Sequence, residues 1–249
     1  MAGERRPIVE EKSTGRTAFQ VAEAYKMIRT NLQFTLADTD NRVVVFSSAE
    51  PSAGKSTLSA NLAIVMAQTG ARVVLVDADM RKPTQHRNFR VSRNLGLSKL
   101  LSGQNTIEEC VAKQVKPNVD LIPSGPTPPN PSELLGSARM RKMLEDLQKQ
   151  YDYVLVDMPP LCVVTDALVV APMAAGVVLA ARYNQTVNEE FDEAIEKVNA
   201  TGAKLLGAVM TDVKIEAGTY GRYGRYGRYG RYGRSRYYRS YDYEYKANK

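Results

Sequence analysis

The chain has 249 residues, with 34 Lys and Arg, 27 Asp and Glu, two cysteines and one histidine. This length accommodates one α/β domain with a large core, or two small domains. One histidine argues against histidine-rich metal sites, and two distant cysteines predict free thiols of a reducing compartment. The sequence contains no run of about 18 apolar residues, so no membrane-spanning helix is expected. The N-terminal MAGERRPIVEEK lacks the apolar stretch of a secretion signal.

The excess positive charge lies at the C-terminal end of the chain. Residues 219–249 contain nine Lys or Arg and two Asp or Glu, which accounts for the whole net charge of +7. The preceding residues are neutral overall. The basic composition therefore gives no sign of a nucleic-acid surface on the folded body.

Residues 1–17 are polar and charged and predict a flexible arm, and residues 18–217 predict one domain. An amphipathic helix is expected over Phe19–Leu36. Apolar runs then predict buried strands over Val43–Ser47, Val73–Asp77, Val119–Ile122, Tyr153–Asp157, Val177–Ala180 and Leu205–Met210. Helical patterns lie between them, including one over Ser132–Gln150. This alternation predicts a doubly wound α/β fold with a mostly parallel sheet flanked by helices.

Residues 218–249 form a tyrosine-rich tail. Tyr220–Arg234 consists of five copies of Tyr-Gly-Arg, and ten of the fourteen tyrosines lie in this tail. A period of three suits neither a helix nor a strand, and the repeats contain no aliphatic residue. Such a segment cannot bury enough apolar surface to offset its ordering entropy, so the tail is predicted to be disordered.

The stretch Val43–Thr57, VVVFSSAEPSAGKST, matches the phosphate-binding pattern G-x-x-x-x-G-K-[ST] with Ala49 in the first position. The strand before it and the amphipathic helix after it are the context that this pattern requires. Lys55 can reach the outer phosphates, and the Ser56 hydroxyl can ligate Mg²⁺. The loop therefore predicts nucleoside triphosphate binding by Ser52, Ala53, Gly54, Lys55, Ser56 and Thr57.

Aspartates stand at the ends of two predicted strands, Asp77 and Asp79 after one and Asp157 after the other. A single strand-end aspartate is usually a helix cap or a turn residue. Three of them beside a phosphate-binding loop favour a Mg²⁺ site together with a separate base for an acceptor hydroxyl.

These motifs together resemble the bacterial tyrosine kinases, the P-loop kinases of capsular and exopolysaccharide synthesis, in their cytosolic Gram-positive form. The resemblance rests on the P-loop, VVLVDADMRKP (Val73–Pro83), IPSGPTPPNPSELL (Ile122–Leu135) and VLVDMPP (Val154–Pro160), and it covers about Phe19–Met210. It implies the fold of the P-loop NTPases and a kinase that uses ATP and Mg²⁺. Lys55, Asp77 and Asp79 would then be catalytic, with Lys55 on phosphate and Asp79 as the base. Mg²⁺ would be organised by Ser56, Asp77 and Asp157.

The resemblance also implies partners and acceptors. The tail would be phosphorylated between subunits of a ring-shaped homo-oligomer, on Tyr220, Tyr223, Tyr226, Tyr229, Tyr232, Tyr237, Tyr238, Tyr241, Tyr243 and Tyr245. A separate transmembrane activator of the polysaccharide chain-length regulator type would recruit this cytoplasmic enzyme to the inner face of the membrane. Protein substrates and a tyrosine phosphatase are also implied.

Two positions depart from the family pattern. The oligomerisation motif E-x-x-R-x-x-R reads Glu23-x-x-Lys26-x-x-Arg29, and lysine lacks the bidentate fork of arginine, so weaker ring assembly is expected. Without the resemblance, these residues are equally well explained as charges on a helix surface. Near Met210, Thr211-Asp212 replaces the asparagine that contacts adenine in related ATPases.

Two alternative functions remain open on sequence grounds. A partitioning or cell-division ATPase would share the fold, but those enzymes carry an extra lysine early in the P-loop, where this chain has Glu50. The tail could instead bind nucleic acid through arginine and tyrosine. The tyrosines among acids in Tyr241–Tyr245, YDYEY, fit phospho-acceptors better, so no nucleic-acid partner is expected.

Overall fold

The computed structural model describes residues 16–213. The predicted N-terminal arm up to residue 15 and the predicted tail from residue 218 lie outside these residues, and so do all ten expected acceptor tyrosines.

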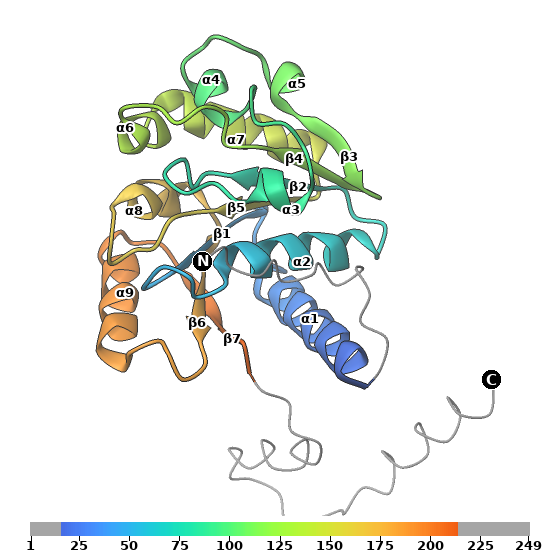
Figure 1. Cartoon of the computed structure of the whole chain (residues 1–249), viewed down its shortest axis with the longest axis vertical. Helices are drawn as coiled ribbons and strands as arrows, with labels where there is room; N and C mark the ends of the chain where they lie inside the picture. The colour runs from blue at the N-terminus through green and yellow to red at the C-terminus, as the bar shows by residue number, and fades with distance from the viewer. Residues whose placement is uncertain (1–15, 214–249) are drawn as a thin grey trace, which may run out of the picture. The chain divides into compact units, whose positions relative to one another are not determined.

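Within the described range, seven strands form one sheet in the order β3-β4-β2-β5-β1-β6-β7 (Figure 1). The strands are β1 (Val43–Ser48), β2 (Val73–Asp77), β3 (Ala112–Lys116), β4 (Val119–Ile122), β5 (Tyr153–Asp157), β6 (Gly176–Arg182) and β7 (Leu205–Thr211). All neighbouring pairs run parallel except β3 and β4, which run antiparallel. The predicted doubly wound α/β fold is therefore confirmed.

All six predicted strands are present, and β2, β4 and β5 have the predicted bounds. Strand β3 was not predicted. Its sequence AKQVK is polar and half-exposed, and it pairs at the sheet edge through a turn in which Asn118 has a φ of 58°. Charged edge strands lack the continuous apolar run that identifies a buried strand.

Helices cover both faces of the sheet, as Figure 1 shows. One core contains residues of α1 (Arg16–Thr35) and α2 (Lys55–Ala67), with Phe89 after the short helix α3 (Gln85–Asn88). The other core lies under α4 (Leu97–Leu101), α5 (Ile107–Cys110), α6 (Pro131–Leu135), α7 (Ala138–Gln150), α8 (Asp166–Val170), the 3₁₀ turn η1 (Ala171–Met173) and α9 (Asn188–Ala200). No helix in the described part of the chain is long and apolar enough to cross a membrane.

Two predicted helices differ from those observed. Helix α1 begins at Arg16 and ends at Thr35, whereas Phe19–Leu36 was predicted. The single helix predicted over Ser132–Gln150 is in fact two, α6 and α7, separated at Gly136 and Ser137. Ser137 caps the second helix, because its hydroxyl accepts a hydrogen bond from the Met140 backbone N–H. Apolar residues recur on both sides of Ser137, so the sequence pattern gives no sign of the break between the two helices.

The sheet brings the ends of three central strands together. Strand β5 lies between β1 and β2, and its last residue, Asp157, is level with Phe46 of β1 and Asp77 of β2. Helix α2 starts at the same edge. Ligands bind beyond the carboxyl ends of parallel strands in folds of this type, so this edge is the candidate functional site.

Candidate active site

The P-loop is held in shape by Gly54 and Thr211. Gly54 precedes α2 with a left-handed φ of 90°, and a Cβ at this position would lie 3.0 Å from the Thr211 hydroxyl oxygen. That hydroxyl donates a 2.7 Å hydrogen bond to the carbonyl of Ala53. Only glycine combines this φ with this close approach. The end of the predicted phosphate-binding loop is therefore hydrogen-bonded to the end of β7.

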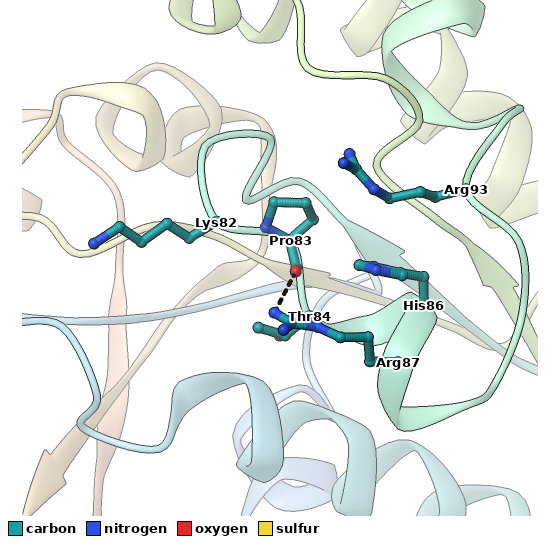
Figure 2. A pocket seen from close by; sticks show the side chains of 6 residues that line it. All are labelled: Lys82, Pro83, Thr84, His86, Arg87 and Arg93. Atoms are coloured by element: carbon teal, nitrogen blue, oxygen red, sulfur yellow. Dashed lines mark hydrogen bonds between the residues drawn. The ribbon is translucent and has the colours of Figure 1, made fainter. Parts of the chain in front are cut away.

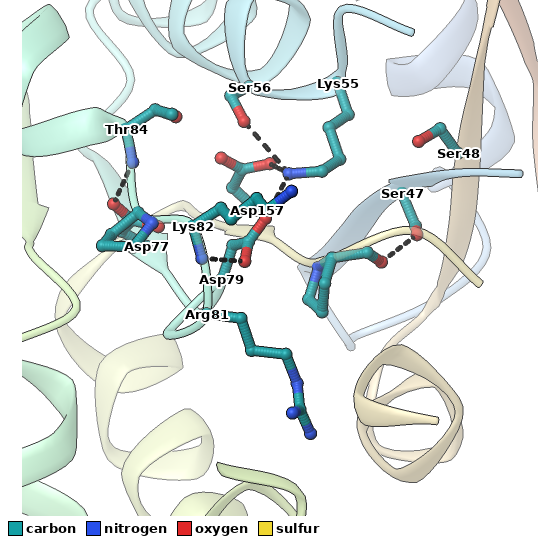
Figure 3. A network of polar contacts seen from close by, with 12 residues as sticks. Ser47, Ser48, Lys55, Ser56, Asp77, Asp79, Arg81, Lys82, Thr84 and Asp157 are labelled. Carbon is teal, nitrogen blue, oxygen red and sulfur yellow. Dashed lines mark hydrogen bonds and ion pairs between the residues drawn. The ribbon is translucent and has the colours of Figure 1, made fainter. Parts of the chain in front are cut away.

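Lys55 lies between two strand-end carboxylates (Figure 3). Its ammonium group donates to Asp79 Oδ2 at 2.8 Å and to the Ser56 hydroxyl at 3.2 Å, and it lies 3.5 Å from Asp157 Oδ1. Burial acts to lower the pKa of Lys55, but the carboxylates of Asp157, Asp79 and Asp77 outweigh it and raise that pKa above its ordinary value. Lys55 is therefore a fixed cation at the start of α2.

Asp77 and Asp157 are fully buried, and each has one oxygen that accepts hydrogen bonds and one open oxygen that accepts none, although the open oxygen of Asp157 lies 3.5 Å from the Lys55 ammonium. Asp77 Oδ2 accepts hydrogen bonds from the backbone N–H groups of Thr84 and Gln85, at 3.2 and 3.0 Å. Asp157 Oδ2 accepts from the Gln85 amide at 2.8 Å. The Oδ1 atoms of both have no hydrogen-bond partner among the described residues. Buried polar atoms without hydrogen bonds are rare in folded proteins, so these two oxygens are suited to a metal ion, a ligand or a water molecule.

Burial and neighbouring carboxylates raise the pKa values of both aspartates. Burial, together with the charge of Asp157, raises the pKa of Asp77 to about 8. Burial also raises the pKa of Asp157, against the opposing effect of Lys55. Two carboxylates with high pKa values gain from a nearby divalent cation, because the cation compensates the charge that burial disfavours.

The oxygen atoms at this site are the type of ligand that Mg²⁺ prefers. The described residues contain no group of three or more His, Cys, Asp or Glu that forms a ready metal site. Mg²⁺ is instead usually bound by one or two carboxylates, with phosphate oxygens and water in the other positions. The Oδ1 atoms of Asp77 and Asp157, with the Ser56 hydroxyl at the start of α2, fit that requirement.

Asp79 differs from these two aspartates in its exposure. It is 4% exposed, whereas Asp77 and Asp157 are 0% exposed. Its Oδ2 accepts from Lys55, and its Oδ1 accepts from the Lys82 backbone N–H at 2.9 Å. Both oxygens are thus held in place, and the carboxylate is the most accessible of the three.

Gln85 is a site residue that the sequence analysis missed. Its buried side-chain amide donates to Asp157, to the Ser56 carbonyl at 2.9 Å and to the Ser59 hydroxyl at 3.2 Å. It therefore joins β5 to the first turn of α2. No pattern in the sequence distinguishes this glutamine from a surface one.

Arg81 is a second missed residue, although it belongs to the VVLVDADMRKP motif. It forms a bidentate ion pair with the buried Asp166 at 2.8 and 2.9 Å, and Ser132 donates to the same carboxylate. This contact connects the loop after Asp79 to the start of α8 and, through Ser132, to the first turn of α6. Two of the four motifs that carried the resemblance are therefore in direct contact, since Arg81 also donates to the Ser132 hydroxyl at 3.3 Å.

Glu50 stands where an extra lysine was considered in the sequence analysis. Its carboxylate accepts a hydrogen bond from the Thr186 hydroxyl of the same chain. Nearby, Arg182 forms an ion pair with Asp212 at 2.8 Å and contacts the Ser52 carbonyl at 3.4 Å. The early P-loop is thus anchored to the loops after β6 and β7.

The three residues of the expected oligomerisation motif lie on α1. Lys26 and Glu23 form an exposed ion pair at 2.7 Å along the helix. Arg29 instead donates to the Val65 carbonyl of α2 at 3.1 Å. The motif therefore has two exposed charges and one arginine that contacts the neighbouring helix.

Comparisons with known proteins agree on one family. The family model described as an AAA domain matches residues 41–204. Tyrosine-protein kinase YwqD of Bacillus subtilis is 40% identical over 204 residues, covering 80% of this chain and 86% of that protein. A putative tyrosine-protein kinase EpsB of Ralstonia nicotianae is 41% identical over 80% of this chain, which spans 26% of that longer protein.

Solved structures give the same result. The kinase domain of Escherichia coli tyrosine kinase ETK superposes with a TM-score of 0.74 at 34% identity, covering 79% of this chain and 78% of that one. The septum site-determining protein MinD of Pyrococcus horikoshii reaches a TM-score of 0.58 at 20% identity, over 68% of this chain and 69% of its own. This second likeness shows a shared fold alone. The chain therefore belongs to the family of bacterial tyrosine-protein kinases.

Proposed function

We propose that this kinase transfers the γ-phosphoryl group of ATP, bound with Mg²⁺, to tyrosine hydroxyls in its own C-terminal tail. The observation that carries the proposal is the pair of open oxygens on Asp77 and Asp157 beside Lys55. A buried cation and two incompletely bonded carboxylates at the start of a P-loop helix fit a nucleotide triphosphate with its metal.

The residues divide the chemistry among them. Residues 52–57 cradle the phosphates through backbone N–H groups, and Lys55 neutralises the outer phosphate charge. Ser56, Asp77 and Asp157 would hold Mg²⁺, and the bound metal would stabilise the negative charge that develops on the transferred group. The tyrosine oxygen bonds to the γ-phosphorus as the bond between that phosphorus and the bridging oxygen breaks and ADP leaves, and Asp79 accepts the hydroxyl proton.

The family resemblance supports the wider setting. We propose that the chain regulates capsular or exopolysaccharide synthesis and that its tail is phosphorylated between subunits of a ring. A separate membrane activator recruits the chain to the inner face of the membrane, and a tyrosine phosphatase removes the phosphate groups from its tail. The exposed pair Glu23 and Lys26 would contribute to the ring contact.

The first test is incubation of the full chain with ATP and Mg²⁺, with and without an activator segment, followed by site-resolved mass spectrometry. We expect phosphotyrosine within residues 220–245, and none in Lys55→Met. Arg72→Gln, which alters an exposed ion pair with Asp152, is the matched control and should behave as the unchanged chain. ATP hydrolysis without any phosphotyrosine, even with activator, would contradict the proposal.

A mixing experiment tests transfer between chains. Lys55→Met with an intact tail is mixed with an active chain whose ten tail tyrosines are replaced by phenylalanine. Phosphotyrosine on the Lys55→Met chain is expected, because the acceptor and the active site then lie on different molecules. If the mixture stays unphosphorylated while the unchanged chain is phosphorylated, transfer occurs within one chain.

A further inference from the structure

A basic pocket lies beside the candidate active site, at the turn that follows Asp79. It has a volume of about 510 Å³, opens to solvent, and is lined by Lys82, Pro83, Thr84, His86, Arg87 and Arg93. Figure 2 shows His86, Arg87 and Arg93 on one side of Pro83 and Thr84, with Lys82 extending from the other side. The lining contains three cationic side chains and no carboxylate.

The cations of this pocket lack the acidic partners that neighbouring basic residues have. Arg87 donates to the Pro83 carbonyl at 3.1 Å, and Arg93 donates to the Gly125 carbonyl at 3.0 Å. Neither forms an ion pair with a carboxylate of residues 16–213, and neither does Lys82, whereas the adjacent Arg81 is paired with Asp166. Burial, together with the nearby charges of Arg93 and Arg87, lowers the pKa of His86, which lines the same pocket.

The pocket is joined directly to the carboxylates of the site. The Lys82 backbone N–H binds Asp79, and the Thr84 backbone N–H binds Asp77. The pocket lies on the β2 side of the site, while the P-loop follows β1, and β5 separates these strands. A polypeptide with a tyrosine hydroxyl at Asp79 would lie close to this pocket, because Lys82 both lines the pocket and binds the Asp79 carboxylate.

We propose that this pocket, with Arg87 and Arg93, binds carboxylate side chains next to the acceptor tyrosine and thereby selects acidic acceptor segments. This inference rests on the proposed function. Unpaired cations in a concave site favour an anionic partner and disfavour a cationic one. The occupant is an acidic stretch of polypeptide, supplied by the tail of another copy of the chain.

The tail contains both kinds of acceptor. Each tyrosine in Tyr220–Arg234 is followed by Gly-Arg, so these acceptors bring positive charge toward the pocket. Tyr241, Tyr243 and Tyr245 alternate instead with Asp242 and Glu244. The pocket therefore favours the YDYEY segment over the repeats, and phosphorylation should begin there.

The test follows the initial rate at each tyrosine of the full chain by mass spectrometry, with ATP, Mg²⁺ and activator. We expect the three YDYEY tyrosines to be phosphorylated about tenfold faster than the repeat tyrosines at low salt. The preference should disappear in Arg87→Gln with Arg93→Gln, and also in Asp242→Asn with Glu244→Gln. Arg87→Lys with Arg93→Lys should restore most of it, because the charges are kept.

Arg141→Gln with Lys142→Gln is the matched control, since it removes two exposed charges of α7 outside the pocket, and it should keep the preference. Equal rates at all tyrosines of the unchanged chain, or a preference that survives in Arg87→Gln with Arg93→Gln, would overturn the inference. So would an equal loss at every tyrosine with a raised KM for ATP, which would assign the pocket to the nucleotide. Complete absence of phosphotyrosine in every chain would overturn the proposed function itself.

Discussion

Two buried regions of this protein use the same residue type in opposite ways. At the site, Asp77 and Asp157 each have an oxygen without a hydrogen bond, and their pKa values are raised. At the other end of the sheet, both oxygens of Asp120 are bonded. Asp120 Oδ2 accepts from the Tyr151 hydroxyl at 2.6 Å and lies 3.0 Å from the Lys113 ammonium, while Oδ1 accepts from the Gln114 N–H at 2.6 Å.

The difference separates a structural carboxylate from a ligand-binding one. Burial alone would raise the pKa of Asp120, but the bonds from Tyr151, Gln114 and Lys113 outweigh it and lower that pKa. A charge that is fully bonded within the chain stabilises the fold. A charge left incompletely bonded costs stability and is retained for a ligand.

The largest expected effect is on phosphoryl transfer. Asp79→Asn removes the proposed base and should lower kcat for tail phosphorylation by about 10²- to 10⁴-fold. Asp152→Asn, at an exposed ion pair, is the control and should leave kcat unchanged. The measurement is the initial rate of phosphotyrosine formation at saturating ATP. An Asp79→Asn chain with normal kcat would exclude this residue as the base.

The second effect contrasts two aspartates by stability in the absence of nucleotide and Mg²⁺. Asp120→Asn should lower the free energy of unfolding by about 1–3 kcal/mol, because Tyr151 and Lys113 lose a charged acceptor. Asp77→Asn should raise that free energy, because folding raises the pKa of this carboxyl to about 8 and so destabilises the fold at neutral pH, a cost that a neutral amide does not have. Urea unfolding at neutral pH measures both. Equal destabilisation by the two changes would remove the distinction between them.

A smaller effect is expected on the loss of folding stability at low pH. The folded-state pKa of Asp120 lies below its ordinary value of 3.8, so its stabilising contribution is complete above that value. The contribution is lost as the pH falls through the folded-state pKa. Urea unfolding between pH 7 and pH 3 should therefore show a shallower acid loss of stability in Asp120→Asn than in the unchanged chain. An identical slope would show that Asp120 is not a charge stabilised by folding.

The smallest effect is expected at the surface. Arg72 and Asp152 form an ion pair at 2.8 Å, but both side chains are largely exposed to solvent. Exposed pairs contribute little, because solvent and salt screen them. Arg72→Gln should leave the midpoint of thermal unfolding within experimental error. A clear fall would mean that exposed pairs contribute to this fold as buried ones do.

The sequence predicted those parts of the molecule that follow from local pattern. Continuous apolar runs located six strands, and the P-loop with the strand-end aspartates located Lys55, Asp77, Asp79 and Asp157 at one edge. The order of the strands, the antiparallel edge strand β3 and the break before Ser137 depend on tertiary packing and on caps, which the apolar pattern does not record.

The supporting contacts of the site were also beyond the sequence. Gln85 lies 72 residues from Asp157 along the chain, and Arg81 lies 85 residues from Asp166. A pairing over such separations is set by the fold and has no local signature. The basic pocket differs, because its lining residues lie close together in the sequence, but the fold decides that their side chains surround one hollow.

The most direct test of the central distinction is the effect of Mg²⁺ on ADP affinity, measured by isothermal titration calorimetry with Mg²⁺ or with chelator. We expect Mg²⁺ to strengthen ADP binding by about tenfold or more in the unchanged chain and in Asp120→Asn. In Asp157→Asn this strengthening should be lost. A full Mg²⁺ effect in Asp157→Asn would contradict the assignment of the open carboxylates to the metal.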